Sequence, residues 1–117
     1  MKAILLVSHG SQSKKTKEEV SRLIVRLQGK TAVKIIKYAF LEIESPSIPD
    51  GIRECIEQGA DEIVVLLNFL NSGKHVDIDI PRIIQEAKTK YPHVRFLTTK
   101  AVGQHDRIIE LFLDMIP

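Results

Sequence analysis

Two histidines are the residues of this chain best suited to chemistry. His9 lies in the segment Ser8-His9-Gly10-Ser11, and His75 lies in a second segment, residues 71–76 (NSGKHV). Each histidine follows an apolar run that is typical of a buried strand, and each segment leads into a helix. An imidazole can bind a divalent metal or move a proton near neutral pH. The chemistry then depends on whether the fold brings the two rings together.

Alternating apolar segments predict an α/β fold. Strands are expected at residues 3–7, 33–41, 62–67 and 94–98, and helices at 14–28, 47–58, 77–90 and 104–115. The order βαβαβαβα predicts a parallel sheet with helices on both faces, in a single domain spanning residues 1–117. Right-handed crossovers favour the flavodoxin-like strand order 2-1-3-4, a three-layer sandwich. The apolar residues of the last helix are expected to face the core: Ile108, Ile109, Phe112, Leu113 and Ile116.

This strand order predicts where the two histidines lie. His9 and His75 follow the first and third strands, so they flank the switch point at which open α/β sheets bind ligands. Adjacent strands lie roughly 4.8 Å apart, which allows both side chains to reach one small ion. Two imidazoles without cysteine suit Co²⁺, Ni²⁺, Zn²⁺ or Fe²⁺. Because a closed structural site normally has four ligands, the pair predicts an open site that receives a metal and releases it.

Two acidic residues end the second predicted strand at the same edge of the sheet. Glu42 or Glu44 can orient a histidine or accept a proton there. The alternative is that both are solvated acids at a strand end, and for Glu44 this interpretation is preferred.

Composition excludes several classes of protein. The 17 basic and 15 acidic residues give a net charge of +2 without a nucleic-acid footprint, and no apolar run approaches a membrane span. The apolar start at residues 3–7 is too short for a signal sequence, so a cytoplasmic protein is expected. Cys55, the single cysteine, lies on the apolar face of a predicted helix and is expected to be a buried thiol.

Four groups of residues carry a family resemblance over essentially the whole chain. They are residues 6–11 (LVSHGS), residues 40–42 with 46–48, residues 69–76 with 79–81 (DIP), and Tyr91-Pro92 with Val102-Gly103. In this register they resemble the CbiX/SirB family of sirohydrochlorin chelatases. The His9 motif alone is unspecific, and the segment from His75 to the DIP triplet is the more specific part.

The resemblance implies a class II chelatase, which inserts a divalent metal into a tetrapyrrole without ATP and without an organic cofactor. Long members have two similar lobes, and this chain matches one, so it resembles the short form that works as a symmetric homodimer. The expected activity is that of a sirohydrochlorin cobaltochelatase in cobalamin biosynthesis. Cobalt is favoured as the metal substrate because short forms are usually assigned so, and Ni²⁺ and Fe²⁺ stay open.

The resemblance also implies residue roles. His9 and His75 would bind the incoming metal and help remove the pyrrole protons, with Glu42 assisting. The substrate's carboxylates would be received by the backbone N–H groups of Gly10 and Ser11 and by Lys74. The lysine run 14–17 either adds to this attraction or is a solvated helix start, and the second interpretation is preferred.

Two departures from the family pattern leave other functions open. Many members have arginine where this chain has Gln12, which removes a bidentate carboxylate partner. A non-catalytic metal or tetrapyrrole carrier is therefore the alternative. The other departure, Leu67 in place of proline, is expected to be structural only. Phosphoryl transfer of the histidine-phosphatase type ranks third, because Ser8 precedes His9 and no arginine is near.

Overall fold

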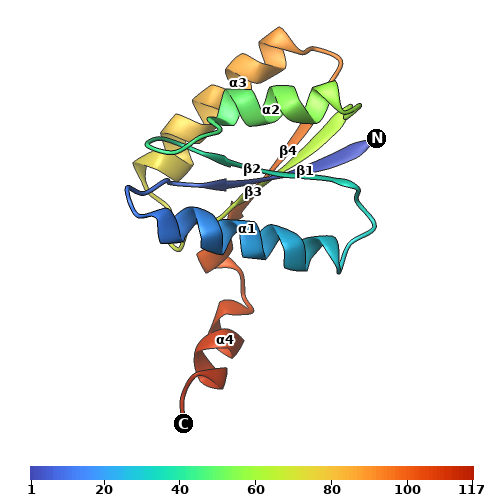
Figure 1. Ribbon diagram of the computed structural model, residues 1–117. Helices are drawn as coiled ribbons and strands as arrows, with labels where there is room; N and C mark the ends of the chain where they lie inside the picture. The colour runs from blue at the N-terminus through green and yellow to red at the C-terminus, as the bar shows by residue number, and fades with distance from the viewer.

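A four-stranded parallel sheet of order β2-β1-β3-β4 forms the centre of the computed structural model, which describes residues 1–117 (Figure 1). The strands are β1 (Lys2–Ser8), β2 (Ile35–Phe40), β3 (Glu62–Leu67) and β4 (Arg95–Ala101). The helices are α1 (Lys14–Gln28), α2 (Ile48–Glu57), α3 (Ile80–Lys90) and α4 (Ile108–Asp114), with a π-helical turn η1 (His75–Asp79) and a 3₁₀ turn η2 (Val102–Gln104). The predicted fold class and strand order are confirmed.

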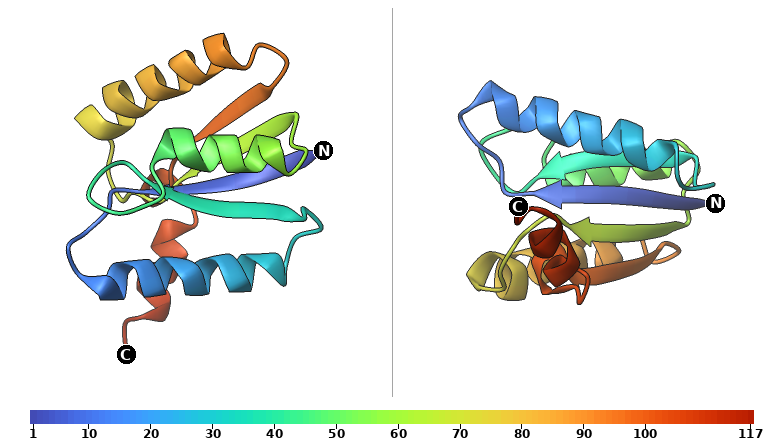
Figure 2. Two further views of the ribbon diagram at one scale, coloured as in Figure 1. Left: turned by 45° about the horizontal axis from the view of Figure 1, so that its top comes forward. Right: turned by 90° about the horizontal axis from the view of Figure 1, so that it is seen from below.

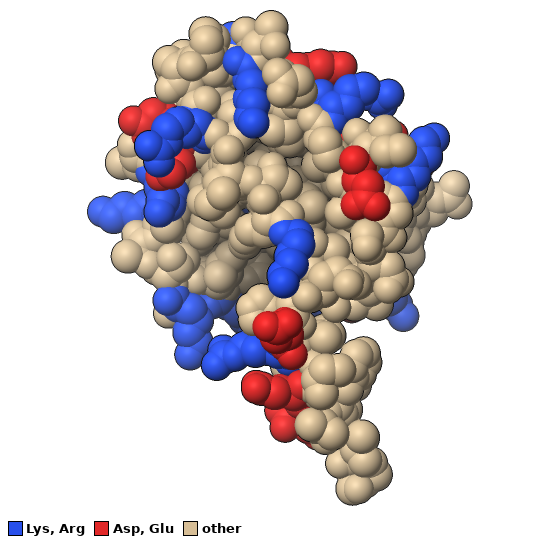
Figure 3. Space-filling view, turned by 180° about the vertical axis from the view of Figure 1, so that it is seen from behind, with Lys and Arg blue, Asp and Glu red and all other residues tan.

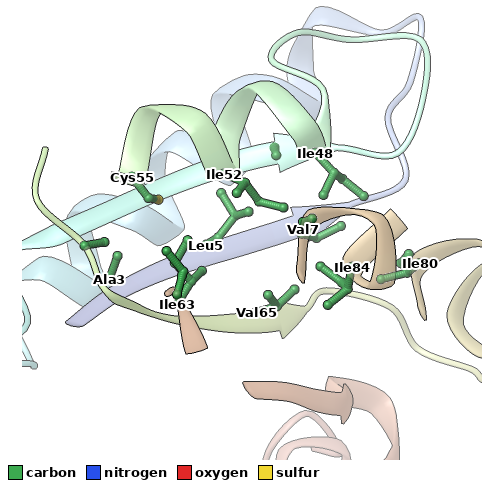
Figure 4. Packing of buried hydrophobic residues seen from close by; sticks show 14 of the residues in the cluster. Ala3, Leu5, Val7, Ile48, Ile52, Cys55, Ile63, Val65, Ile80 and Ile84 are labelled. Atoms are coloured by element: carbon green, nitrogen blue, oxygen red, sulfur yellow. The ribbon is translucent and has the colours of Figure 1, made fainter. Parts of the chain in front are cut away.

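One face of the sheet is fully covered by α2 and α3 (Figures 1 and 4). Leu5 of β1, Ile52 of α2 and Val65 of β3 have no solvent exposure. Burying each such side chain contributes roughly 1.5–3 kcal/mol. Gly51 lets α2 approach this closely, since a Cβ at that position would lie 2.9 Å from Leu5 Cδ1. This packing fixes β1 at the centre of the sheet.

The opposite face is covered only in part, by α1 (Figure 2). Ile36, Ile4, Val64 and Leu97 are register partners in one row that crosses the sheet from β2 to β4. Ile36 and Ile4 are 6% and 8% exposed, Val64 is half-buried, and Leu97 is 58% exposed. Helices therefore lie on both faces, as predicted, but α1 leaves the β3–β4 half of its face bare.

The last helix is present as predicted but is shorter, and the prediction that its apolar residues face the core is wrong. β4 continues to Ala101, η2 takes the next three residues, and α4 has only seven residues. None of them is buried, and Ile109, Phe112, Leu113 and Ile116 are 58–65% exposed. Helical periodicity identifies an apolar face but not what covers it. None of the helices combines the length and apolar content that spanning a membrane requires.

Candidate metal centre

The two histidines and Glu42 come together at the carboxyl edge of the sheet. His9 directly follows β1, His75 begins η1, and their ring centroids are 5.0 Å apart. Glu42 lies two residues beyond β2, with its Oε1 atom 3.7 Å from His9 Nε2. One ligand atom from each of the three residues lies within 4.8 Å of the other two.

Backbone pairing beyond the strands positions His9 and Glu42. Leu41 N–H donates to Ser8 O at 2.9 Å, and Glu42 N–H donates to His9 O at 3.1 Å. Gly10 makes this approach possible. Its φ is +104°, and a Cβ there would lie 1.9 Å from Glu42 O. Glycine reaches this φ without the steric cost that a side chain brings. The β1–α1 loop and the β2–α2 loop are thus joined side by side at the site.

Hydrogen bonds determine which nitrogen each imidazole offers. His9 Nδ1 lies 3.0 Å from the Gly10 carbonyl oxygen, and His75 Nδ1 lies 2.8 Å from Asp79 Oδ2. A carbonyl and a carboxylate only accept, so each Nδ1 carries the proton and donates it. In the neutral rings each Nε2 then keeps a free lone pair. Each histidine therefore offers its Nε2 atom to a metal or to a proton.

Asp79 is the site residue that the sequence analysis missed. Its side chain is only 16% exposed, and Arg82 Nη2 lies 3.9 Å from its other carboxylate oxygen. The turn η1 places residues 75 and 79 on one side, as any helical i, i+4 pair is placed. The signal was present as a His followed four residues later by Asp. In the sequence that Asp had a meaning only as the first residue of the DIP triplet.

The three converging groups can hold a divalent metal if their side chains move inward. Ligand atoms bound at about 2.1 Å to one ion are about 3.4 Å apart at a tetrahedral angle, so the widest pair must close by up to about 1.4 Å. The His9, His75 and Glu42 side chains are 41%, 42% and 52% exposed, which gives them room to do so. Three ligands leave a coordination position open, as a site that exchanges its metal needs.

The loop residues expected to bind substrate lie beside this centre, with one correction. The Ser11 N–H donates to Glu44 Oε1 at 2.8 Å, so Glu44 is not the solvated acid that the sequence suggested. The loop turns back there, with Ile43 at φ +72° and Glu44 N–H donating to Glu42 O.

The expected helix entry is also displaced. α1 begins at Lys14 with Ser13 as its N-cap, so Gly10 and Ser11 precede the helix instead of starting it. A substrate carboxylate can reach the Ser11 N–H only by displacing Glu44. Lys74 is exposed next to His75.

A hydrogen bond between the buried Ser8 and the half-buried Asn68 supports the two histidine loops. Asn68 Nδ2 donates to Ser8 Oγ at 3.0 Å, and Ser8 is 5% exposed. Asn68 N–H also donates to Val7 O at 2.8 Å. The ends of β1 and β3, from which the two loops leave, are therefore held at a fixed separation.

Comparison with known proteins places this chain in one family. A sequence model of the family CbiX matches residues 3–117. A sirohydrochlorin ferrochelatase of Priestia megaterium is 35% identical, covering 99% of this chain and 44% of that protein. A sirohydrochlorin cobaltochelatase of Methanocaldococcus jannaschii is 28% identical, over 97% of this chain and 96% of that protein. The crystal structure of the sirohydrochlorin chelatase SirB from Bacillus subtilis with cobalt superposes with a TM-score of 0.86, at 30% identity over 97% of this chain and 50% of that one.

The chain therefore belongs to the CbiX family, whose members named above are sirohydrochlorin chelatases. It spans about half the length of the Priestia megaterium and Bacillus subtilis proteins and nearly the whole of the Methanocaldococcus jannaschii protein. The relatives are named for both iron and cobalt, so the family does not by itself assign the metal.

Proposed function

We propose that this protein inserts a divalent metal ion into sirohydrochlorin without a nucleotide or an organic cofactor. One observation carries the proposal: two imidazole Nε2 atoms with free lone pairs and one carboxylate converge at the carboxyl edge of the sheet. This set can hold a metal ion and can also accept protons. Insertion requires both properties, because each metal that enters the macrocycle displaces two pyrrole protons.

The proposed mechanism divides these tasks among the three side chains. His9 and His75 hold the metal substrate through Nε2 on the open side of the site. As the metal passes to the macrocycle nitrogens, Glu42 and the released Nε2 atoms are free to accept the two protons. Holding metal and macrocycle together removes most of the entropic cost of their encounter, and a positioned base lowers the cost of proton removal.

Basic residues near the centre suit a substrate rich in carboxylates. A hollow of about 840 Å³ beside the first loop is lined by residues that include Lys14, Lys17, Tyr38 and Glu44. Lys17 Nζ lies 6.0 Å from the centre of the Tyr38 ring. Glu18 and Glu44 line the same hollow and balance the two lysine charges, so Lys74, exposed next to His75, is the basic side chain that best supports substrate attraction.

Cobalt is the proposed metal, and a homodimer is the proposed working form. Support for cobalt comes from the relative of matching length, which is named a cobaltochelatase. Support for a dimer comes from the longer relatives, of which this chain covers half. One lobe lines one side of a flat macrocycle, so a second copy is needed to line the other.

Insertion assays test the proposal. Purified protein is incubated with sirohydrochlorin and Co²⁺, Ni²⁺ or Fe²⁺, and the change in macrocycle absorbance is followed against the uncatalysed rate. We expect the largest acceleration with Co²⁺ and its near loss in His9→Ala and in His75→Ala. His93→Ala is the matched control, because His93 is exposed in the loop before β4.

The same assay separates enzyme from carrier. Tight binding of metal and macrocycle with no acceleration by any of the three metals would refute the chelatase proposal and favour a carrier. Full activity in both histidine variants would refute the assignment of the site.

A further inference from the structure

The loop after β2 contains a strained turn beside the metal centre. Ile43 has a φ of +72°, and Glu44 N–H donates across it to Glu42 O at 2.8 Å. A hydrogen bond across a single residue of positive φ defines the rare, strained form of the γ-turn. An isoleucine makes this conformation costlier because its branched Cβ crowds the backbone, whereas glycine or asparagine would reduce the cost.

Packing of the Ile43 side chain does not offset this cost. The residue is 58% exposed and belongs to neither hydrophobic cluster of the core. Strained backbone persists where the surrounding structure holds it, and it is concentrated at active sites and ligand-binding segments. Because the fold gains little from an isoleucine here, we expect its side chain to make a contact outside the folded chain.

Contacts on both sides hold the turn in place. Before the turn, Glu42 N–H donates to His9 O at 3.1 Å. After it, Glu44 Oε1 accepts a hydrogen bond from Ser11 N–H at 2.8 Å. Ile43 is therefore presented from a fixed turn, directly next to the proposed metal ligand Glu42.

Apolar side chains are also exposed on the segment that carries the other histidine. Leu70, in the loop that leads to His75, is 63% exposed, and Ile78, in η1 itself, is 58% exposed. A hydrated metal ion gains nothing from apolar neighbours. The flat conjugated ring of a tetrapyrrole does, since its carboxylates lie at the edge of the ring and leave its faces apolar.

The charges on the back of the molecule offer no competing site for the ring. On the face seen in Figure 3, basic and acidic side chains are interspersed, with uncharged surface between them. An anionic macrocycle finds no broad basic surface there. We therefore assign ring binding to the metal centre, where exposed apolar side chains and the metal ligands lie on the same loops.

We propose that Ile43 is a substrate-contact residue, whose side chain packs on the face of the tetrapyrrole ring while the adjacent Glu42 holds the metal. This inference rests on the proposed function and adds to it a residue that positions the ring. Because the γ-turn ties residues 42–44 together, the metal ligand and the ring contact belong to one rigid unit. The turn thereby sets the ring's position relative to the metal.

Three variants of Ile43 separate a ring contact from a role in folding. Ile43→Gly and Ile43→Asn relieve the strain and remove the apolar side chain, whereas Ile43→Leu keeps an apolar side chain. We expect the first two to unfold at the same or a higher urea concentration than the wild type. They should nevertheless bind metal-free sirohydrochlorin about 4- to 12-fold more weakly, which corresponds to half of the burial free energy of an isoleucine. Ile43→Leu should stay within about twofold of the wild type.

Two titrations supply the readouts. The absorbance of sirohydrochlorin reports ring binding without metal, and Co²⁺ is titrated separately without the ring. We expect all three variants to keep the Co²⁺ affinity within about twofold, because the Glu42 carboxylate is unchanged. Val25→Asn is the matched control: Val25 is 66% exposed on α1, and its replacement should alter neither dissociation constant.

Three results would overturn the proposal. The first is unchanged ring binding in both Ile43→Gly and Ile43→Asn. The second is an equal loss of Co²⁺ affinity and ring affinity in both variants, which would show that residue 43 only shapes the loop. The third is weaker ring binding that accompanies dissociation into monomers in sedimentation, which would show that Ile43 contacts a second copy of the chain.

The insertion assay keeps this inference separate from the proposed function. If the wild type binds the ring but inserts no metal, and the Ile43 variants bind it more weakly, the chelatase is refuted and the ring contact stands. If the wild type inserts cobalt and both variants bind the ring as tightly as it does, the reverse holds. A wild type that does not bind sirohydrochlorin would overturn both.

Discussion

Asp79 is expected to control the metal affinity of His75, and Asp79→Asn tests this with almost no change in shape. The carboxylate accepts the Nδ1 proton of His75 at 2.8 Å and is largely shielded from solvent. The amide of asparagine lacks the charge and can also donate to Nδ1. Part of the population then carries its proton on Nε2, where it blocks the metal.

The size of the effect follows from the bond that is weakened. A hydrogen bond to a charged group contributes roughly 1.5–3 kcal/mol, and each 1.4 kcal/mol is a factor of ten in affinity. We therefore expect the affinity for Co²⁺ to fall about 10- to 100-fold. Direct titration measures it, and ¹⁵N chemical shifts of His75 report the gain of the Nε2–H tautomer.

Two neighbouring residues provide matched controls. Asp77 lies in the same turn but is exposed, and Asp77→Asn should leave both the affinity and the tautomer unchanged. Arg82 Nη2 lies 3.9 Å from Asp79 Oδ1, and the Arg82 side chain is exposed. Arg82→Ala should therefore weaken cobalt binding by at most about 1 kcal/mol. An unchanged cobalt affinity in Asp79→Asn, with His75 still protonated on Nδ1, would refute the positioning argument.

Three further predictions concern the loop, the core and the dimer. Gly10→Ala should destabilise the fold by about 1–3 kcal/mol more than Gly59→Ala in urea unfolding, since both have φ near +105° but only Gly10 has a neighbour in the path of its Cβ. Burial raises the pKa of the Cys55 thiol from 9.0 to about 11, so the unfolded chain loses this proton first as pH rises. The free energy of unfolding should then fall between about pH 9 and 11, by up to roughly 3 kcal/mol, and Cys55→Ala should lack this slope. The insertion rate per chain should fall on dilution below the dimer dissociation constant, whereas the cobalt affinity should not; parallel dilution series measure both.

The sequence was sufficient to predict the parts of the molecule that depend on local pattern and chain connectivity. Apolar runs located β1 and β3, and the handedness of crossovers then gave the strand order. Because that order places the ends of β1 and β3 side by side, the convergence of His9 and His75 followed from it. The end of β4 was missed, since Lys100 and the two threonines interrupt the apolar pattern of an edge strand.

The parts that the sequence did not predict depend on contacts between distant segments. Glu44 reaches Ser11 only because the loop after β2 turns back on itself at Ile43. The neighbouring Ser45-Pro46 predicts a loop, but a β-branched residue such as Ile43 rarely adopts the positive φ at which this loop bends. The exposure of Phe112 and its neighbours likewise depends on the hydrogen bonds from Gly103 and Gln104 to the loop after β3, which direct the chain away from the sheet.

One chain of this size can supply a complete metal centre, but it can line only one side of a macrocycle. All of the proposed ligands and the hydrogen bonds that orient them come from one chain, through loops that the sheet holds in register. A metal ion is small enough for one sheet edge to present it. A macrocycle has two faces, and a single lobe lines one of them. A second lobe brought to the carboxyl edge of the sheet, where the histidine loops lie, would line the other face.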